Sequence, residues 1–332
     1  MPIKTLHIGL GPIGAGVVRQ VASRKGFRIV GAVDIDPNKT GKDLGDVCNI
    51  GRKLRVKIAA DIAKTIRATK PDVAVLCTSS SLKRVVPEFE AVLKLKVPIV
   101  STTEELAYPV RGNAAAAKKI DALAKRARVA VLGTGVNPGF TMDALPIALT
   151  GVCENVTAIE VARVQDASIR RLPFQQKIGA GLTPEEFMKK VDGGSVRHVG
   201  LAESINMIAD AMGWKLDKVT DEIQPKICEK LTSSQFLTVA PGQVCGIVQD
   251  GVGYRKGEPI IKLHMEAYLG APESFDAVRI SGSPSISSMI AGGVHGDIAT
   301  AAITVNSIPK VLQAQPGLRT MRDMALPSYF GG

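Results

Sequence analysis

Long apolar runs and aromatic residues are scarce in this chain of 332 residues. Aromatic side chains make up 4% and hydrophobic residues 45%, so the core has to be built mainly from Ala, Val, Ile and Leu. Because no apolar stretch approaches the roughly 18 residues that span a bilayer, we expect no membrane segment. The N-terminus also lacks the longer apolar segment and the small-residue cleavage site of a signal peptide.

Cysteine pairs and metal-binding patterns are absent as well. The five cysteines are odd in number, widely spaced and without a CxxC pair, which argues against a disulfide framework or a structural zinc site and favours a reducing cytoplasm. The four histidines are scattered with no HExxH, so we expect no catalytic metal. There is no GxSxG elbow, and no cysteine has the surroundings of an acylating nucleophile, which disfavours such hydrolases and aldehyde dehydrogenases.

The charge is strongly positive, with a formal net value of +11. The Lys and Arg residues are nevertheless scattered singly, and no dense basic tract with interleaved aromatics is present. We therefore expect no nucleic-acid partner. An anionic small ligand, such as a phosphate-bearing cofactor, would satisfy the same charge.

Apolar strands alternate with helical stretches in the first part of the chain, which predicts βαβ units and a doubly wound parallel sheet of the α/β class. Beyond about residue 140 the apolar and polar residues alternate, as in 154–166 and 258–270, which predicts a second α+β domain with an open mixed or antiparallel sheet. We expect a nucleotide-binding domain at 1–140, a substrate and dimerisation domain at 141–300, and a C-terminal helical segment at 301–332 that packs back on the first domain.

The run GLGPIG, residues 9–14, follows an apolar strand and opens a helix, which is the context of a Rossmann dinucleotide loop rather than of a chance turn. Gly9 allows the tight turn, Gly11 the approach of a pyrophosphate, and Gly14 the close packing of helix on strand. Asp34 ends the second strand and would bind the adenine ribose, which favours NAD. NADP stays open, because the downstream cations could bind its extra phosphate. The expected cofactor contacts also include Pro12, Ile13, Thr78 and Ser79, and the cations are Lys39, Arg52 and Lys53.

Two further strand-end segments carry polar side chains. In STTEELAYP, residues 101–109, the adjacent Glu104 and Glu105 could bind an ammonium group and accept its proton, or could simply begin a helix. If the segment is extended, one carboxylate faces the crevice and the other points away. In GTGVNPGF, residues 133–140, we expect Pro138 to expose Asn137, which could hold substrate or the nicotinamide amide, or could serve only the turn.

These motifs, together with the block at 292–322, resemble the dihydrodipicolinate-reductase-like group, and within it the 2,4-diaminopentanoate dehydrogenase and native amine dehydrogenase family. The resemblance spans essentially the whole chain. It implies reversible NAD(P)-dependent oxidative deamination of an amine, ammonia as co-substrate of the reverse reaction, and a homodimer. It also implies that the catalytic carboxylate lies in the TEE stretch, at Glu104 with Glu105 as the alternative. The HH and KxDAPSGTA signatures of true dihydrodipicolinate reductases are absent.

The candidate substrate contacts are Tyr108, Arg163, His264 and Asn306, although His264 could equally be a packed core histidine. Arg163, Arg170 or Arg171 could bind a substrate carboxylate, or could be solvated strand and loop charges. Two alternative functions stay open at this point. One is a dehydrogenase of a diamino or hydroxy acid, including 2,4-diaminopentanoate itself, and the other is a protein that senses NAD(H) without catalysis.

Overall fold

The computed structural model describes residues 1–109 and 112–332, and these divide into two compact units. The first unit comprises 1–140 and 295–332, and the second comprises 141–294. The boundary expected at 300 falls inside helix α10 (Gly296–Gln313). The residues from 295 onward therefore belong with the N-terminal unit.

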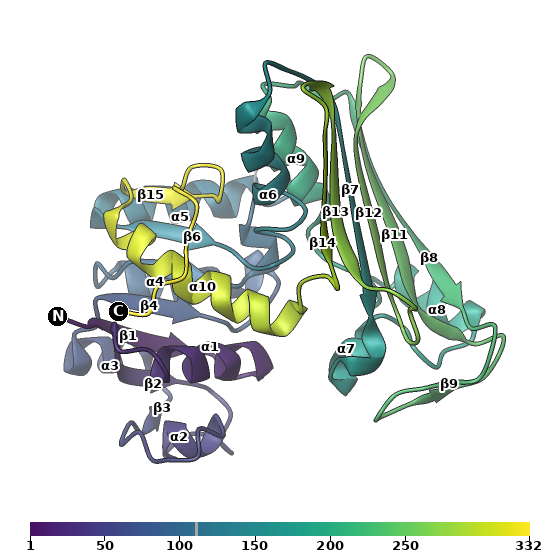
Figure 1. The fold of residues 1–332 in the computed structure, drawn as a ribbon. Helices are drawn as coiled ribbons and strands as arrows, with labels where there is room; N and C mark the ends of the chain where they lie inside the picture. Colours follow the sequence, from purple (N-terminus) through teal and green to yellow (C-terminus); the bar gives the residue numbers. More distant parts are fainter. Residues whose placement is uncertain (110–111) are drawn as a thin grey trace. The chain divides into compact units, whose positions relative to one another are not determined.

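A seven-stranded parallel sheet forms the centre of the first unit, in the order β15-β6-β5-β4-β1-β2-β3 (Figure 1). Its inner strands are buried and apolar, as expected for a sheet that helices cover on both faces. The doubly wound sheet predicted from the sequence is thus confirmed. The strands are β1 (Ile3–Ile8), β2 (Phe27–Val33), β3 (Ile58–Ala59), β4 (Val73–Leu76), β5 (Ile99–Ser101), β6 (Ala130–Gly133) and β15 (Gly317–Arg319).

Helices cover the two faces of this sheet in separate groups. Helix α10 packs along α1 on one face, while α3, α4 and α5 pack together on the other (Figure 1). The bounds are α1 (Pro12–Ala22), α2 (Leu44–Val47), α3 (Ile62–Thr69), α4 (Leu82–Leu93) and α5 (Ala114–Ala127), with a 3₁₀ turn η1 (Glu104–Leu106) after β5.

The C-terminal segment is only partly helical, whereas the sequence predicts a helical segment over 301–332. Helix α10 ends at Gln313, and Gly317–Arg319 forms β15, which pairs in parallel with β6 at the edge of the sheet. Pro316 cannot continue a helix, and Gly317 has a φ of +123° that other residues rarely adopt. These two residues turn the chain into the strand.

The second unit contains a six-stranded mixed sheet in the order β14-β13-β7-β12-β11-β8. Strands β7 and β12 are parallel, and the other neighbours are antiparallel. The mixed sheet expected for this part of the chain is confirmed. Its strands are β7 (Asn155–Asp166), β8 (Lys218–Ile227), β11 (Val244–Arg255), β12 (Glu258–Tyr268), β13 (Phe275–Ser283) and β14 (Ile286–Ala291), and a small separate hairpin holds β9 (Thr232–Ser233) and β10 (Thr238–Val239).

One face of this mixed sheet carries the core of the second unit. Alternate residues of β12, among them Ile261, Leu263 and Met265, pack into that core with helix α9. The residues between them are half-exposed or exposed. The helical elements are α6 (Ala144–Leu149), η2 (Thr150–Val152), η3 (Ala167–Ile169), α7 (Leu172–Lys177), α8 (Pro184–Asp192) and α9 (Leu201–Ala211). In the parts of the chain that the structure describes, no helix has the length and apolar character to cross a membrane.

Candidate functional site: a dinucleotide loop and a strand-end carboxylate

The glycine loop connects β1 to α1 in the first unit. Gly9 has a φ of +84°, and a Cβ there would lie 2.6 Å from the carbonyl oxygen of Cys77. A Cβ on Gly14 would lie 2.0 Å from the carbonyl oxygen of Gly9. Both positions therefore require glycine for the loop to pack as it does against the end of β4.

Gly11 differs from the other two glycines, because a Cβ there would meet no atom within 4 Å. It is the residue that precedes α1, and Pro12 occupies the first helical position, followed by Ile13. The first turn of α1 carries no acidic side chain, so its N–H groups and partial positive charge are open to an anion. The space at Gly11 and the helix terminus fit the pyrophosphate of a dinucleotide cofactor.

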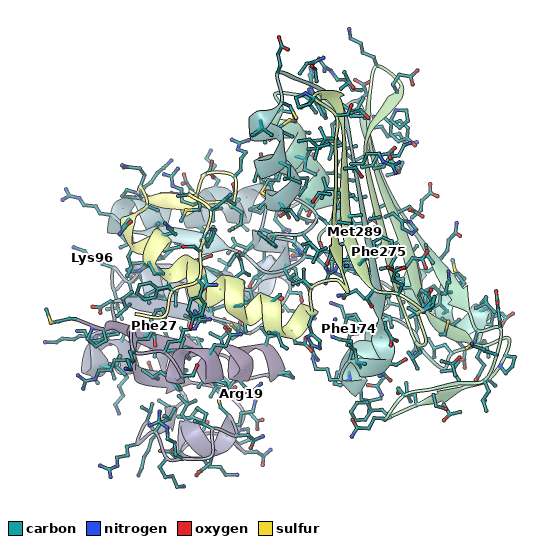
Figure 2. All side chains as sticks on the ribbon, viewed as in Figure 1. Arg19, Phe27, Lys96, Phe174, Phe275 and Met289 are labelled. Carbon is teal, nitrogen blue, oxygen red and sulfur yellow. The ribbon has the colours of Figure 1, made fainter. Side chains whose placement is uncertain are left out.

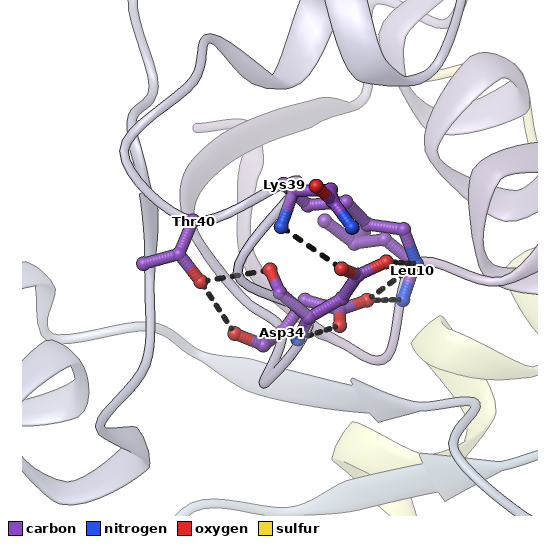
Figure 3. Close-up of polar contacts among 6 residues, drawn as sticks. Leu10, Asp34, Lys39 and Thr40 are labelled. Carbon is purple, nitrogen blue, oxygen red and sulfur yellow. Dashed lines mark hydrogen bonds and ion pairs between the residues drawn. The ribbon is translucent and has the colours of Figure 1, made fainter.

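Asp34 lies just after β2 and is 9% exposed. Its Oδ2 accepts hydrogen bonds from the backbone N–H of Leu10 at 2.7 Å and from Lys39 Nζ at 3.2 Å, and its Oδ1 accepts from the N–H of Asp36 at 2.9 Å (Figure 3). The bond to Leu10 ties the carboxylate directly to the glycine loop. This is the position from which an acidic residue binds the ribose hydroxyls of a dinucleotide.

Thr78 and Ser79 follow β4 beside the same loop. The Thr78 hydroxyl donates to Glu88 Oε2 at 2.6 Å, and burial raises the pKa of Glu88 although this bond opposes the rise. Ser79 Oγ accepts from the N–H of Ser81 at 3.2 Å, just before α4. Both side chains line the loop that Gly9 contacts, and their role as cofactor contacts stays a prediction.

Glu104 and Glu105 lie in the 3₁₀ turn η1, not in an extended segment. Glu105 Oε2 accepts from the backbone N–H of Leu82 at 2.8 Å and from Asn113 Nδ2 at 3.3 Å. Leu82 is the first residue of α4, so Glu105 satisfies one of the backbone donors at that helix end. The structure thus gives Glu105 a structural task, and the catalytic role expected for Glu104 stays a prediction.

Close packing fixes the turn that carries these carboxylates. Ser101 Oγ donates to the carbonyl oxygen of Leu76 at 3.0 Å and lies within hydrogen-bond distance of Thr103 Oγ1, also at 3.0 Å. A Cβ on Gly133 would lie 2.6 Å from the carbonyl group of Leu106. The ends of three neighbouring strands therefore hold η1 in one position.

The loop after β6 brings more polar groups to the same edge. Asn137 is 8% exposed, so the expectation that Pro138 exposes it is wrong; the loop folds the side chain inward. Thr134 is 3% exposed, and its hydroxyl has no hydrogen-bond partner among the described residues. Thr134 was not foreseen from the sequence, and a buried hydroxyl of this kind suits a ligand group. Tyr108, expected near substrate, is buried at the end of the TEEL segment.

Arg163, expected as a substrate contact, is buried on β7 of the second unit. Its Nη1 forms an ion pair with Asp276, and its Nη2 donates to the carbonyl oxygen of Val294 at 2.8 Å. Burial lowers the pKa of Arg163, and Asp276 opposes that effect. This charge is already neutralised within the unit, so we assign Arg163 to the structure of the second unit and not to substrate binding.

His264 cannot line one surface with Arg163. Strand β12 pairs with β7 so that Met265 lies opposite Arg163 and His264 opposite Ala162. Since successive side chains of a strand point to opposite faces, His264 and Arg163 lie on opposite faces of the sheet. The sequence could not show this, because the register between the two strands is not a local property.

Acidic neighbours surround His264 on its face of the sheet. Its ring nitrogens contact Asp250 Oδ1 at 2.7 Å and Glu266 Oε1 at 3.1 Å. Burial alone would lower the pKa of His264, but these two carboxylates together raise it. The side chain therefore belongs to a surface charge network.

Asn306, the last expected substrate contact, lies on α10. Its Oδ1 accepts from Arg24 Nη1 at 2.6 Å and from the N–H of Phe330 at 3.2 Å. The ring of Phe330 in turn packs edge-on against Phe27. The carboxamide oxygen thus anchors the C-terminal tail, and the substrate contact expected of Asn306 stays a prediction.

Sequence reasoning also missed Ile35. Its side chain is 90% exposed directly beside Asp34, an unusual position for a large apolar group. The signal was present in the sequence, since VDIDP places one apolar residue between two acids at a strand end. An exposed apolar side chain beside the ribose carboxylate suits the adenine ring of a dinucleotide.

Comparisons with known proteins show the family of this chain. The family model described as 2,4-diaminopentanoate dehydrogenase C-terminal domain matches residues 140–332, and that of the dihydrodipicolinate reductase N-terminus matches residues 3–134. The chain is 36% identical to the 2,4-diaminopentanoate dehydrogenase of Acetoanaerobium sticklandii, over 99% of this chain and 95% of that protein. It is 21% identical to an amine dehydrogenase of Streptomyces virginiae, over 99% of this chain and 98% of that protein.

The fold has a solved counterpart. The structure of an amine dehydrogenase from Mycobacterium smegmatis matches with a TM-score of 0.88 and 24% identity, and the match covers 100% of this chain and 98% of that one. At this identity the structural match shows the fold alone, whereas the relatives found by sequence show the family. With a full-length relative, a matching C-terminal family model and a dinucleotide loop, the chain belongs to the 2,4-diaminopentanoate dehydrogenase family of NAD(P)-dependent oxidoreductases that act on CH–NH₂ groups.

Proposed function

We propose that this chain catalyses the reversible oxidative deamination of an amine: R₂CH–NH₂, NAD(P)⁺ and water give R₂C=O, ammonia, NAD(P)H and a proton. The observation that carries the proposal is the position of Glu104 in a closely packed turn at a strand end of the sheet that bears the glycine loop. Glu105 holds the start of α4 through Leu82, and Glu104 precedes it in a turn that three strand ends fix. A fixed carboxylate on the unit that bears the glycine loop can form an ion pair with a positively charged substrate nitrogen and accept its proton.

The chain's own residues have separate tasks in this reaction. The glycine loop and Asp34 hold the dinucleotide, whose nicotinamide supplies the hydride chemistry when it is bound. Glu104 pairs with the substrate ammonium, takes its proton, and stabilises the iminium cation that hydride loss leaves on the substrate carbon and nitrogen. In the reverse direction the same carboxylate transfers protons at the ammonia nitrogen as this nitrogen adds to the carbonyl carbon of the ketone.

A 2,4-diamino acid is the second substrate candidate. The identity of 36% to a 2,4-diaminopentanoate dehydrogenase, against 21% to an amine dehydrogenase, favours it. Such a substrate carries a carboxylate and needs a cation. With Arg163 committed to Asp276, we propose the neighbouring Arg170 or Arg171 for that contact.

The test is the oxidation of NADH and NADPH with two ketones, cyclohexanone and 2-amino-4-oxopentanoate, each with and without excess ammonium. We expect turnover only when ammonium is present, because the amine nitrogen has to come from solution. A preference for the amino-oxo acid would identify a diamino-acid enzyme, and a preference for cyclohexanone a simple amine dehydrogenase. The measurement is the absorbance of the reduced cofactor.

Other outcomes would change the assignment. Turnover that does not depend on ammonium would make the protein a carbonyl reductase and would remove the role of Glu104. Tight cofactor binding without turnover of either ketone would favour the sensing protein, which family membership already disfavours.

We also propose that two copies associate through the half-exposed face of the mixed sheet. One row across that face joins Met289, Ala277, Ala162 and His264 through the pairing of β14, β13, β7 and β12. Met289, labelled in Figure 2, is 59% exposed. A wide face that combines apolar side chains with paired charges suits a partner surface better than it suits water.

For the variant Met289→Asp we expect dimer dissociation to become about tenfold easier or more, because a charge would enter an apolar contact. Sedimentation velocity at several concentrations measures the shift. Leu326→Asp, at an exposed apolar position of the first unit, is the matched control and should leave the dimer intact. A wild-type monomer at all concentrations would contradict the proposal.

A cytoplasmic location is the last element of the proposal. All five cysteines are without a disulfide in the described structure, and three of them are buried. Burial raises the pKa of Cys48 and of Cys77 to about 11 each, so these thiols stay protonated and unreactive at neutral pH. Cysteines without disulfides are typical of a reducing compartment.

A further inference from the structure

A lysine occupies the acidic end of β2, where cofactor specificity is decided. Lys39 Nζ lies 3.2 Å from Asp34 Oδ2 (Figure 3) and 3.5 Å from Asp36 Oδ2, so one ammonium group bridges two carboxylates. Asp34 also accepts the backbone N–H groups of Leu10 and Asp36. The carboxylate is thus fixed by the backbone, and the ammonium is added to it from the following loop.

The two known forms of the dinucleotide need opposite chemistry at this point. A ribose 2′-hydroxyl needs an acceptor, whereas a 2′-phosphate needs a cation and is repelled by carboxylates. Hydrogen bonding to the N–H of Asn38, and then the charge of Lys39, lowers the pKa of Asp36, so this carboxyl is ionised at neutral pH. The two carboxylates and the one ammonium group carry a formal net charge of −1.

Hydrogen bonds fix the backbone around Lys39, whereas the Lys39 side chain is partly exposed to solvent. The N–H groups of Lys39 and Thr40 donate to the carbonyl oxygen of Asp36 at 3.0 and 3.1 Å. The Thr40 hydroxyl contacts the carbonyl oxygens of Asp34 and Asp36, each at 3.1 Å. The Lys39 side chain remains 27% exposed on four rotatable bonds. Its ammonium group can therefore turn from the carboxylates to a nearby anion without a change of the backbone.

We infer that Lys39 determines the cofactor specificity of this protein, and that Asp36 opposes it. Paired with Asp34, the ammonium leaves the carboxylate in place for the ribose diol of NAD. Turned outward, it binds the 2′-phosphate of NADP, and Asp36 competes for it. The chain accordingly binds both cofactors and favours NAD. This inference rests on the proposed placement of the cofactor at the glycine loop.

The test measures dissociation constants for NADH and NADPH by fluorescence titration, and for adenosine 2′,5′-bisphosphate by calorimetry. We expect Lys39→Met to weaken the binding of NADPH and of the bisphosphate about tenfold or more, while the dissociation constant of NADH changes less than about threefold. Lys39→Arg keeps the charge and should keep NADPH binding. Asp36→Asn should strengthen the binding of NADPH about threefold or more, because the substitution releases the Lys39 ammonium group and removes a charge that repels the 2′-phosphate.

Two controls separate this inference from the proposed function. Lys42→Met removes the same charge from the same loop, at an exposed residue outside the ion pairs of Lys39 with Asp34 and Asp36, and should change the dissociation constant of neither cofactor more than about threefold. Gly11→Val tests placement: if it binds both cofactors as the wild type does, the proposed site is wrong. If Gly11→Val loses both cofactors but Lys39→Met changes NADH and NADPH equally, only the specificity inference fails. A wild-type chain that binds NADPH more than about a hundredfold more weakly than NADH would overturn it as well.

Discussion

Glu104→Gln should lower kcat for ketone amination by about a hundredfold or more and leave the dissociation constant of NADH within about threefold. Gln has the size of Glu but cannot take a proton, and lost acid–base groups cost about 10²–10⁴ in rate. The cofactor is expected to bind at the glycine loop and Asp34, which this change does not touch. Steady-state rates with saturating ammonium, together with a fluorescence titration of NADH, measure the two effects.

Glu105→Gln is the matched control, since it makes the same chemical change one residue away. Gln still offers an acceptor oxygen to the N–H of Leu82, so the start of α4 should persist and kcat should stay within about threefold. A large loss in Glu105→Gln with little loss in Glu104→Gln would reverse the two roles. Losses of equal size in both variants would show that the turn acts as a structural unit only.

Gly11→Val should weaken NADH binding about a hundredfold or more and leave the folded protein intact. The position of a Cβ at Gly11 is open, so the larger side chain meets no protein atom nearby, but it occupies the space through which a pyrophosphate approaches the helix. We expect the thermal midpoint to change by less than about 3 °C. Calorimetric titration with NADH and a thermal melt without cofactor test the two statements.

Gly14→Ala gives the contrasting result. Its Cβ would lie 2.0 Å from the carbonyl oxygen of Gly9, so the loop has to shift. We expect the free energy of unfolding to fall by about 2 kcal/mol or more, along with the loss of cofactor. If Gly11→Val bound NADH as well as the wild type, the pyrophosphate would have to lie elsewhere.

The parts that the sequence predicted correctly depend on local patterns. The order of strand, glycine loop and helix at 3–22 is contained in one continuous segment, and so is the acidic end of the following strand. Alternating apolar residues likewise indicated the change to a mixed sheet after residue 140. Each of these patterns follows from the geometry of a single element, and no knowledge of distant partners is needed.

The parts that it could not predict depend on pairings between distant residues. Arg163 finds Asp276 more than a hundred residues away, and Glu105 finds the start of α4. The opposite orientation of His264 and Arg163 follows only from the register of β12 on β7. Asn306 reads as a polar residue on a helix, and its bond to the C-terminal tail could not be foreseen.

The edge strand β15 has a consequence for synthesis. The strand pairs with β6, although residues 141–294, the whole second unit, lie between the two strands in the sequence. The same unit separates α10 in sequence from α1, against which it packs. The chain is synthesised from its N-terminus. Until residues 295–332 have been made, β6 lacks its neighbour β15 and one face of the sheet lacks helix α10. Residues 141–294 can fold in that time. The unit translated first is therefore the unit completed last, and during that interval the unpaired edge of β6 can form hydrogen bonds with other chains.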